Sequence, residues 1–288
     1  AQINPLNPAS YTAIDSLTFI FEGGVSLQNM NISGSGVKLN AKNSSFDYLA
    51  MQFRLHPRIA MSIGLLPFSN VGYSVSDTQT ATDPNTGATA DYARSYTGDG
   101  GLHQLYAGLG VKVLKNLSVG VNASYFWGDI NRTRVVYFPS VSGAYNYNHQ
   151  SVASVSSYKL DFGAQYTLDI DKKHSVTIGA VYSPELKLGN DYSVTTQMVS
   201  NSTGTAVSTT TLSPDATFKV PNTFGVGFTY NYDKRLTVGL DYSLQQWSKT
   251  KFDVNTPDEA VREDFKETYT YCDRHKISVG AEYIPNLI

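Results

Sequence analysis

The sequence contains no long apolar run. No stretch of its 288 residues approaches the ~18 consecutive apolar residues that a membrane-spanning helix requires. In lipid, only helices and closed barrels satisfy every backbone polar group, so a membrane form of this chain has to be a closed sheet. The first residues also lack the basic and apolar segments of a secretory signal. Because such a signal is removed after export, this absence leaves export open.

Cysteine and net charge are scarce as well. Cys272 is the only cysteine, which excludes an internal disulfide and the paired-cysteine metal and redox motifs. The formal net charge is −2 and the basic residues are scattered, so no nucleic-acid partner is expected. One acidic stretch lacks the ordered spacing of a calcium loop and is interpreted as a solvated loop; it contains Asp253, Asp258, Glu259, Glu263, Asp264 and Glu267.

Motifs of catalysis are missing too. The sequence has no nucleophile elbow, no phosphate-binding loop and no zinc-protease motif, and its five histidines show no metal-ligand spacing. We therefore predict no catalytic residue, no metal site and no cofactor, and we do not expect an enzyme.

The residues that are abundant indicate an all-β protein. Tyrosine (20 residues), glycine (23 residues), serine, threonine and asparagine recur throughout, which is typical of strands and turns. Between Tyr158 and Ile170 every second residue is apolar, while Lys159, Asp161 and Gln165 take the alternate positions. Successive strand side chains point to opposite faces, so one face of this strand is apolar and the other is wet. A soluble sandwich would show the same alternation.

The lengths of the connections favour a barrel over a sandwich. Short turns such as His56-Pro57 and Lys115-Asn116 alternate with long polar stretches such as 78–101 and 132–154. Outer-membrane barrels have short periplasmic turns opposite long extracellular loops, whereas a sandwich has no such rule. The pattern predicts an antiparallel up-and-down transmembrane β-barrel with strands at roughly 17–29, 46–56, 58–76, 102–114, 116–131, 155–170, 174–197, 207–231, 234–252 and 265–284.

Several segments of the sequence resemble the FadL family of outer-membrane long-chain fatty-acid transporters. Near the start, Asn7-Pro8-Ala9 is similar to a box in the N-terminal hatch that plugs barrels of this family. The alternative is that these three residues only cap the first strand. The further matches run in order along the chain and comprise Ile178–Glu185, Val220–Gly227, Leu236–Tyr242 with Trp247-Ser248, and Asp273–Tyr283.

The resemblance implies a fourteen-stranded barrel, of which about ten strands are present. We expect residues 1–16 to be a hatch remnant and residues 17–288 to form barrel strands with long extracellular loops. Roughly the last four strands and part of the hatch are expected to be missing because the sequence is an incomplete record of a longer chain. The alternative is a barrel that closes differently, since an open edge in lipid leaves backbone groups unpaired.

The resemblance also implies a function in the bacterial outer membrane. We expect passive uptake of long-chain fatty acids or other small hydrophobic compounds, in contact with outer-membrane lipid and lipopolysaccharide. Asn7, Pro8 and Ala9 are the hatch candidates. An apolar run in the third long connection is the candidate capture loop and comprises Val135, Val136, Tyr137 and Phe138, although it could equally extend a strand.

Two other functions remain open at this stage. A barrel of this family can be a structural subunit of a larger outer-membrane secretion or assembly complex, with other outer-membrane proteins as its partners. A porin for polar solutes would need an open lumen with clusters of charge.

Overall fold

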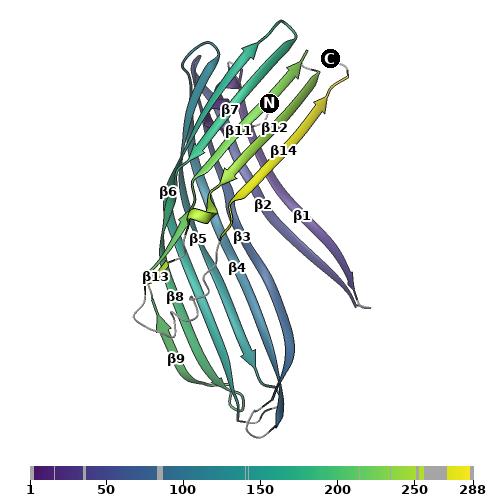
Figure 1. Ribbon diagram of the computed structural model, residues 1–288, viewed down its shortest axis with the longest axis vertical. Helices are drawn as coiled ribbons and strands as arrows, with labels where there is room; N and C mark the ends of the chain where they lie inside the picture. The colour runs from purple at the N-terminus through teal and green to yellow at the C-terminus, as the bar shows by residue number, and fades with distance from the viewer. Residues whose placement is uncertain are drawn as a thin grey trace.

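The computed structural model describes residues 3–15, 17–34, 37–82, 87–139, 141, 143–213, 215–233, 235–250, 253–255 and 271–285. Their fold is almost entirely antiparallel β-sheet (Figure 1). The elements are η1 (Pro8–Ala13), β1 (Phe19–Gly34), β2 (Val37–His56), β3 (Ile59–Thr82), β4 (Thr89–Lys112), β5 (Leu117–Tyr137), β6 (Tyr145–Asp169), β7 (His174–Ser183), β8 (Leu186–Ser200), β9 (Ala206–Leu212), β10 (Asp215–Val220), β11 (Thr223–Tyr232), β12 (Leu236–Gln245), η2 (Trp247–Lys249), β13 (Asp253–Asn255) and β14 (Arg274–Tyr283). No helix among these residues is long and apolar enough to cross a membrane.

Ten of the described strands form one continuous path. Their order is β1-β2-β3-β4-β5-β6-β7-β11-β12-β14, in which each strand pairs with the next. The up-and-down barrel wall of about ten strands predicted from the sequence is thereby confirmed. The remaining strands, β8, β9, β10 and β13, lie off this path, and β8 takes over from β7 as the partner of β6 at the far end.

The two faces of the wall differ as the alternation predicts. Leu160, Phe162 and Leu240 point outward and keep between 44% and 48% of their surface exposed, which suits side chains that contact lipid. On the opposite face of β5, Ser118, Asn122 and Ser124 are buried. Small and polar residues therefore line the interior.

The turns from β2 to β3, β4 to β5, β6 to β7 and β11 to β12 are short and lie at the same end of the barrel, which is the periplasmic end in proteins of this architecture (Figure 1). In the turn from β6 to β7, the Asp171 carboxylate accepts hydrogen bonds from the backbone N–H groups of Lys173 (2.7 Å) and His174 (2.8 Å). These bonds lower the pKa of the Asp171 carboxyl. Asp233 adopts a positive φ of 51° in the turn before β12, a conformation that Asp tolerates.

The strands continue far beyond the membrane at the opposite end, and here the predicted boundaries were wrong. β3 and β4 are 24 residues long each, and β6 is 25 residues long, whereas about 9–11 residues cross a bilayer. Most of the predicted loops at 78–101 and 132–154 are therefore paired strand. Outside the membrane both faces of a strand contact water, so the apolar alternation that marks a strand disappears.

Two predicted strands are also interrupted by proline. The segment 174–197 breaks at Pro184 into β7 and β8, and the segment 207–231 divides into β9, β10 and β11, with Pro221 before β11. The register pairs Ser183 with Thr223 and Leu186 with Val220, so the two breaks lie side by side. Proline cannot donate to a ladder, which is why both strands stop there. Of the predicted strand 265–284, residues 265–270 lie outside the described residues.

The wall splits between β2 and β3. Their pairing extends only from His56 and Ile59 to Leu49 and Leu65, although both strands continue. β3 has an irregular register at Pro67, just beyond this point. Figure 1 shows β1 and β2 leaving the course of β3 and β4 here.

Candidate functional site: the plug and the barrel interior

An N-terminal segment, residues 3–15, lies against the inner face of the wall; we call it the plug. Its centre is the 3-10 helix η1, which begins with Pro8 at a position where proline is tolerated. The Asn7 side chain caps this helix by accepting a hydrogen bond from the Ala9 N–H (3.1 Å). Asn7, Pro8 and Ala9 thus lie against the inner face of the wall, and their role as a hatch stays a prediction.

Eight hydrogen bonds join the plug to the wall within the described residues, and each involves a side chain. They connect Ile3 with Glu22, Pro5 with Asn122, Asn7 with Ala164, Tyr11 with Gln52 and Asn122, Thr12 with Arg54 and Ser118, and Ile14 with Arg54. Because the bonds reach from β1 to β6, they fix the plug on several strands at once.

Tyr11 is the largest fully buried residue of the plug. Its ring has no exposed surface and packs with Ile14, Ala60 and Tyr106. Its hydroxyl donates a hydrogen bond to the Asn122 Oδ1 (2.9 Å). Burial raises the pKa of the Tyr11 phenol, so the group stays a neutral donor at any physiological pH.

Glycines of the wall allow the plug backbone to approach closely. A Cβ on Gly120 would lie 2.6 Å from the Ala9 nitrogen, and a Cβ on Gly163 would lie 2.8 Å from the Pro8 Cδ. The same crowding affects Gly108 and Gly110 of β4, opposite the plug residues Tyr11 and Pro8. We call these four residues the glycine seat: Gly108, Gly110, Gly120 and Gly163.

Substitution in the glycine seat is expected to displace the plug. In Gly120→Ala the new Cβ overlaps plug backbone, and overpacking of this kind costs about 1–3 kcal/mol. We expect faster maleimide labelling of a cysteine placed at Ser10, in a chain whose Cys272 is replaced by serine. Gly239→Ala is the matched control, since its nearest neighbour would be the Thr229 Oγ1 at 4.0 Å. Equal labelling in both variants would contradict a seated plug.

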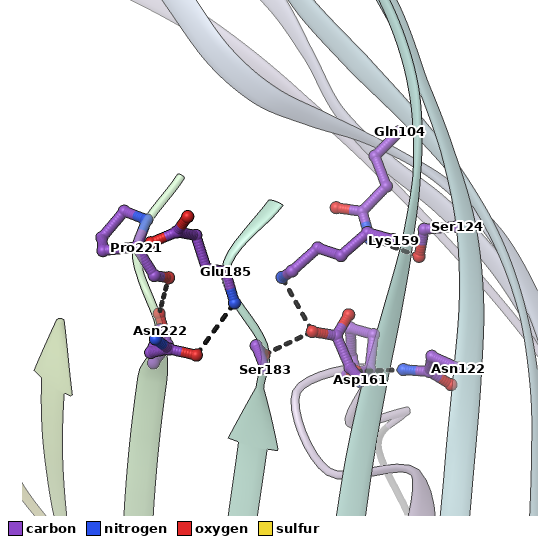
Figure 2. A network of polar contacts seen from close by, with 11 residues as sticks. Gln104, Asn122, Ser124, Lys159, Asp161, Ser183, Glu185, Pro221 and Asn222 are labelled. Carbon is purple, nitrogen blue, oxygen red and sulfur yellow. Dashed lines mark hydrogen bonds and ion pairs between the residues drawn. The ribbon is translucent and has the colours of Figure 1, made fainter. Parts of the chain in front are cut away.

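A polar network lines the interior above the plug (Figure 2). Lys159 and Asp161 of β6 form an ion pair of 2.7 Å, with only 15% and 14% of their side chains exposed. Ser183, at the end of β7, donates a hydrogen bond to Asp161. Across the proline breaks, the Asn222 Oδ1 accepts a hydrogen bond from the Glu185 N–H (2.9 Å). This network ties the ends of β7 and β11 to each other and to β6.

Two cavities flank the split between β2 and β3, and Pro67 lines both. The first, of about 290 Å³, touches the plug at Ile3 and Pro5 and is otherwise lined by Glu22, Asp47, Tyr48, Ala50 and Leu66. The second, of about 560 Å³, reaches the outward-facing His103 and Trp127. The split therefore has hollows beside the plug and on the outer side of β3.

The candidate capture residues lie on and next to a strand instead of in a loop. Val135, Val136 and Tyr137 are the last residues of β5, and their side chains alternate between its faces. Phe138 follows directly; its N–H donates to Asn146 (3.1 Å), its carbonyl accepts from Asn201 (2.6 Å), and its ring lies 5.8 Å from that of Tyr92. The four residues thus form no single apolar patch, and their role in capture stays a prediction.

Most of the residues that hold the plug could not be predicted from the sequence. Asn122, Gln52 and Arg54 are unremarkable inward residues of predicted strands, and only their position on the wet face could have drawn notice. Gly108 and Gly110 share one face of β4, which is the one signal that predicts a close approach. Of the acidic stretch, only Asp253 is described; Asp258, Glu259, Glu263, Asp264 and Glu267 lie outside the described residues.

The BamG family model matches residues 1–288, which is the whole sequence. The chain belongs to the BamG family. No curated protein matches the sequence of this BamG-family chain.

Solved structures show that the BamG-family chain has the fold of FadL-type outer-membrane β-barrels. One such structure is described as a TodX deltaS2S3 mutant monoaromatic hydrocarbon channel. Its sequence is 14% identical to this chain, the TM-score is 0.60, and the superposition covers 98% of this chain and 74% of the channel. The Ralstonia pickettii toluene transporter TbuX is 17% identical with a TM-score of 0.57, covering 98% and 77%. A Pseudomonas aeruginosa FadL homologue is 14% identical with a TM-score of 0.58, covering 97% and 71%. The FadL-like fold predicted from the sequence is confirmed.

Proposed function

We propose that this BamG-family chain is a plugged outer-membrane barrel that serves as a subunit of a larger outer-membrane assembly. The observation that supports this most is the fixation of the plug by eight hydrogen bonds and the glycine seat. A plug that moved for each molecule passing along the lumen would break these bonds every time, at about 0.5–1.5 kcal/mol each, so the fixed plug argues against passage straight through the barrel. The proposed role involves no bond chemistry.

The chemistry of the interior agrees with a structural role. A cavity of about 280 Å³ beside Asn7 is lined largely by polar and small residues of β6, β7, β11, β12 and β14, including Gln165, Thr177, Asp241 and Lys276. Apolar ligands prefer pockets lined by apolar and aromatic side chains with few polar groups. This cavity is therefore a poor receptor for an acyl chain.

A second candidate function is the passage of small hydrophobic compounds, including fatty acids. The split between β2 and β3 favours it, because the two cavities that share Pro67 offer a lateral route from the plug towards the outer side of the wall. The solved proteins of similar fold include a monoaromatic hydrocarbon channel and a toluene transporter. Shielding an alkyl chain from water is worth about 0.8 kcal/mol per buried CH₂, which could drive such a passage.

One pair of measurements separates the two functions. The tagged chain is extracted from its native outer membrane in mild detergent for native mass spectrometry, and purified chain is placed in vesicles with radiolabelled toluene or oleate. We expect the chain in fixed stoichiometry with other outer-membrane proteins, and uptake no faster than into empty vesicles. A chain that runs alone and accelerates uptake would establish the passage function instead.

A further inference from the structure

Beyond Leu65, β3 has a hydrogen-bonded neighbour on one side only. Its pairing with β2 ends there, while its pairing with β4 continues to Thr82 and Thr89. Among the described residues, segment 66–82 of β3 therefore has a free backbone edge, visible in Figure 1 where β2 departs. At about 3.3 Å per residue this edge is on the order of 50 Å long.

The free edge of β3 lacks the usual protection. Natural sheets blunt exposed edges with lysine, proline or very short strands, since unpaired N–H and C=O groups recruit other strands. Between Phe68 and Thr82 the sequence has no lysine, arginine or proline. The diverging part of β2, in contrast, carries Lys38 and Lys42, and β9 at the other side of the extended sheet is only seven residues long. Segment 68–82 of β3 is thus a long unprotected edge of the described sheet; β1, which pairs with β2 alone, is another.

This edge is held in an extended conformation before any partner binds. Asp77 of β3 forms an ion pair of 2.5 Å with Arg94 of β4, and Thr80 donates a hydrogen bond to Asp91 (2.6 Å). The hydrogen bond from Arg94 lowers the pKa of the Asp77 carboxyl, so the pair persists at neutral pH. A preorganised strand loses little conformational entropy when another strand adds to it.

The height of the edge indicates what could occupy it. Since about 9–11 residues of a strand cross the bilayer, residues 59–69 suffice for the span, and segment 70–82 projects above the lipid. At this level the long extracellular loops of a neighbouring barrel also project. Main-chain hydrogen bonds from an extended segment would satisfy the free edge, as in other cases of strand addition.

We propose that segment 70–82 of β3 receives an extended strand from an extracellular loop of a neighbouring outer-membrane barrel, which lengthens the sheet beyond β3. The proposal rests on the proposed role as a subunit and names the surface and the kind of partner. The added strand would lie in the gap that the departure of β2 leaves beside β3.

Site-specific photocrosslinking of the full chain in living cells tests the proposal. A photoreactive residue is placed in turn at the exposed outer-face positions Asn70, Gly72, Ser74 and Ser76, and the crosslinked peptides are identified by mass spectrometry. We expect the crosslinks to fall on one segment of another outer-membrane protein. Each time the photoreactive residue moves by two positions along β3, the crosslinked residue of the partner should also move by two positions. Thr209 and Thr211 of β9 serve as matched controls and are expected to give no such series.

Proline variants test the backbone edge directly. Neighbouring strand N–H groups point to opposite edges, so one of Ser74→Pro and Val75→Pro disturbs the ladder to β4 and the other removes a free donor. The variant that keeps the heat-modifiable barrel is expected to lose the crosslinks from Gly72 and Ser76. Unchanged crosslinks in that variant would overturn the proposal.

The other possible crosslinking results also decide whether a strand is added to β3. Crosslinks between two copies of this chain, crosslinks scattered over many proteins, or none would overturn the added strand. If stoichiometric partners copurify and the series is still absent, this proposal fails while the role as a subunit stands. If the chain runs alone and gives no series, both fail.

Discussion

Tyr11→Ala is expected to release the plug and make the outer membrane permeable to large polar solutes. Tyr11 is fully buried at the contact between the plug and the wall, and deletion of a buried aromatic side chain costs about 3–5 kcal/mol. The substitution also leaves the Asn122 Oδ1 without its donor. Cells that produce the variant should admit vancomycin, which wild-type cells exclude.

Tyr11→Phe provides the matched control for this prediction. It keeps the packing against Ile14, Ala60 and Tyr106 and removes only the hydroxyl. A buried acceptor left unsatisfied costs about 1–3 kcal/mol, so the plug should loosen without leaving. We expect little added vancomycin sensitivity for the phenylalanine variant. If the alanine variant stays as resistant as wild type while its barrel is folded and abundant, the plug is not held by Tyr11.

The plug also links the two candidate functions. A fixed plug suits a subunit whose surfaces are its working parts, whereas lateral passage would use the split between β2 and β3 and would not need the plug to move. Vancomycin entry after Tyr11→Ala therefore measures the plug alone. If the wild-type chain takes up toluene and a variant with a large residue in place of Pro67 does not, the uptake follows the lateral route.

Much of the wall could be predicted from the sequence, because lipid on one side and water on the other impose a period of two. The alternation from Tyr158 to Ile170 places Leu160 and Phe162 outside, as the structure shows. The short turns, such as the one at Asp171, could be predicted because their residues favour specific turn geometries.

The extracellular strands and the plug contacts could not be predicted in the same way. β3 runs to Thr82 and β6 starts at Tyr145, although neither end carries an apolar face. The glycine seat joins residues of β4, β5 and β6 to a segment about 100 or more positions away, and only the three-dimensional register brings them together. The ordered FadL-like matches along the chain are what indicated a plugged barrel in advance.

Leu240→Arg is expected to destabilise the barrel far more than an arginine at the adjacent Gly239. Leu240 lies in the middle of β12 with 48% of its surface exposed on the outward face. An arginine that faces lipid near the bilayer midplane costs about 2–4 kcal/mol. Gly239 faces inward, where a cavity of about 420 Å³ contains Asp241 and Glu282 as counter-charges.

The comparison of these two variants tests the physical basis of the fold. Guanidinium unfolding in lipid vesicles should show a lower midpoint for Leu240→Arg and a midpoint near wild type for Gly239→Arg. Both variants add the same charge to the same strand one residue apart, so the net charge of the two variants is equal. Glycine and leucine differ in strand propensity by at most about 1 kcal/mol, which is less than the cost expected from the lipid that surrounds the arginine of Leu240→Arg. A larger loss for Gly239→Arg would mean that the apolar face of β12 packs against protein and that the polar face does not enclose a wet interior.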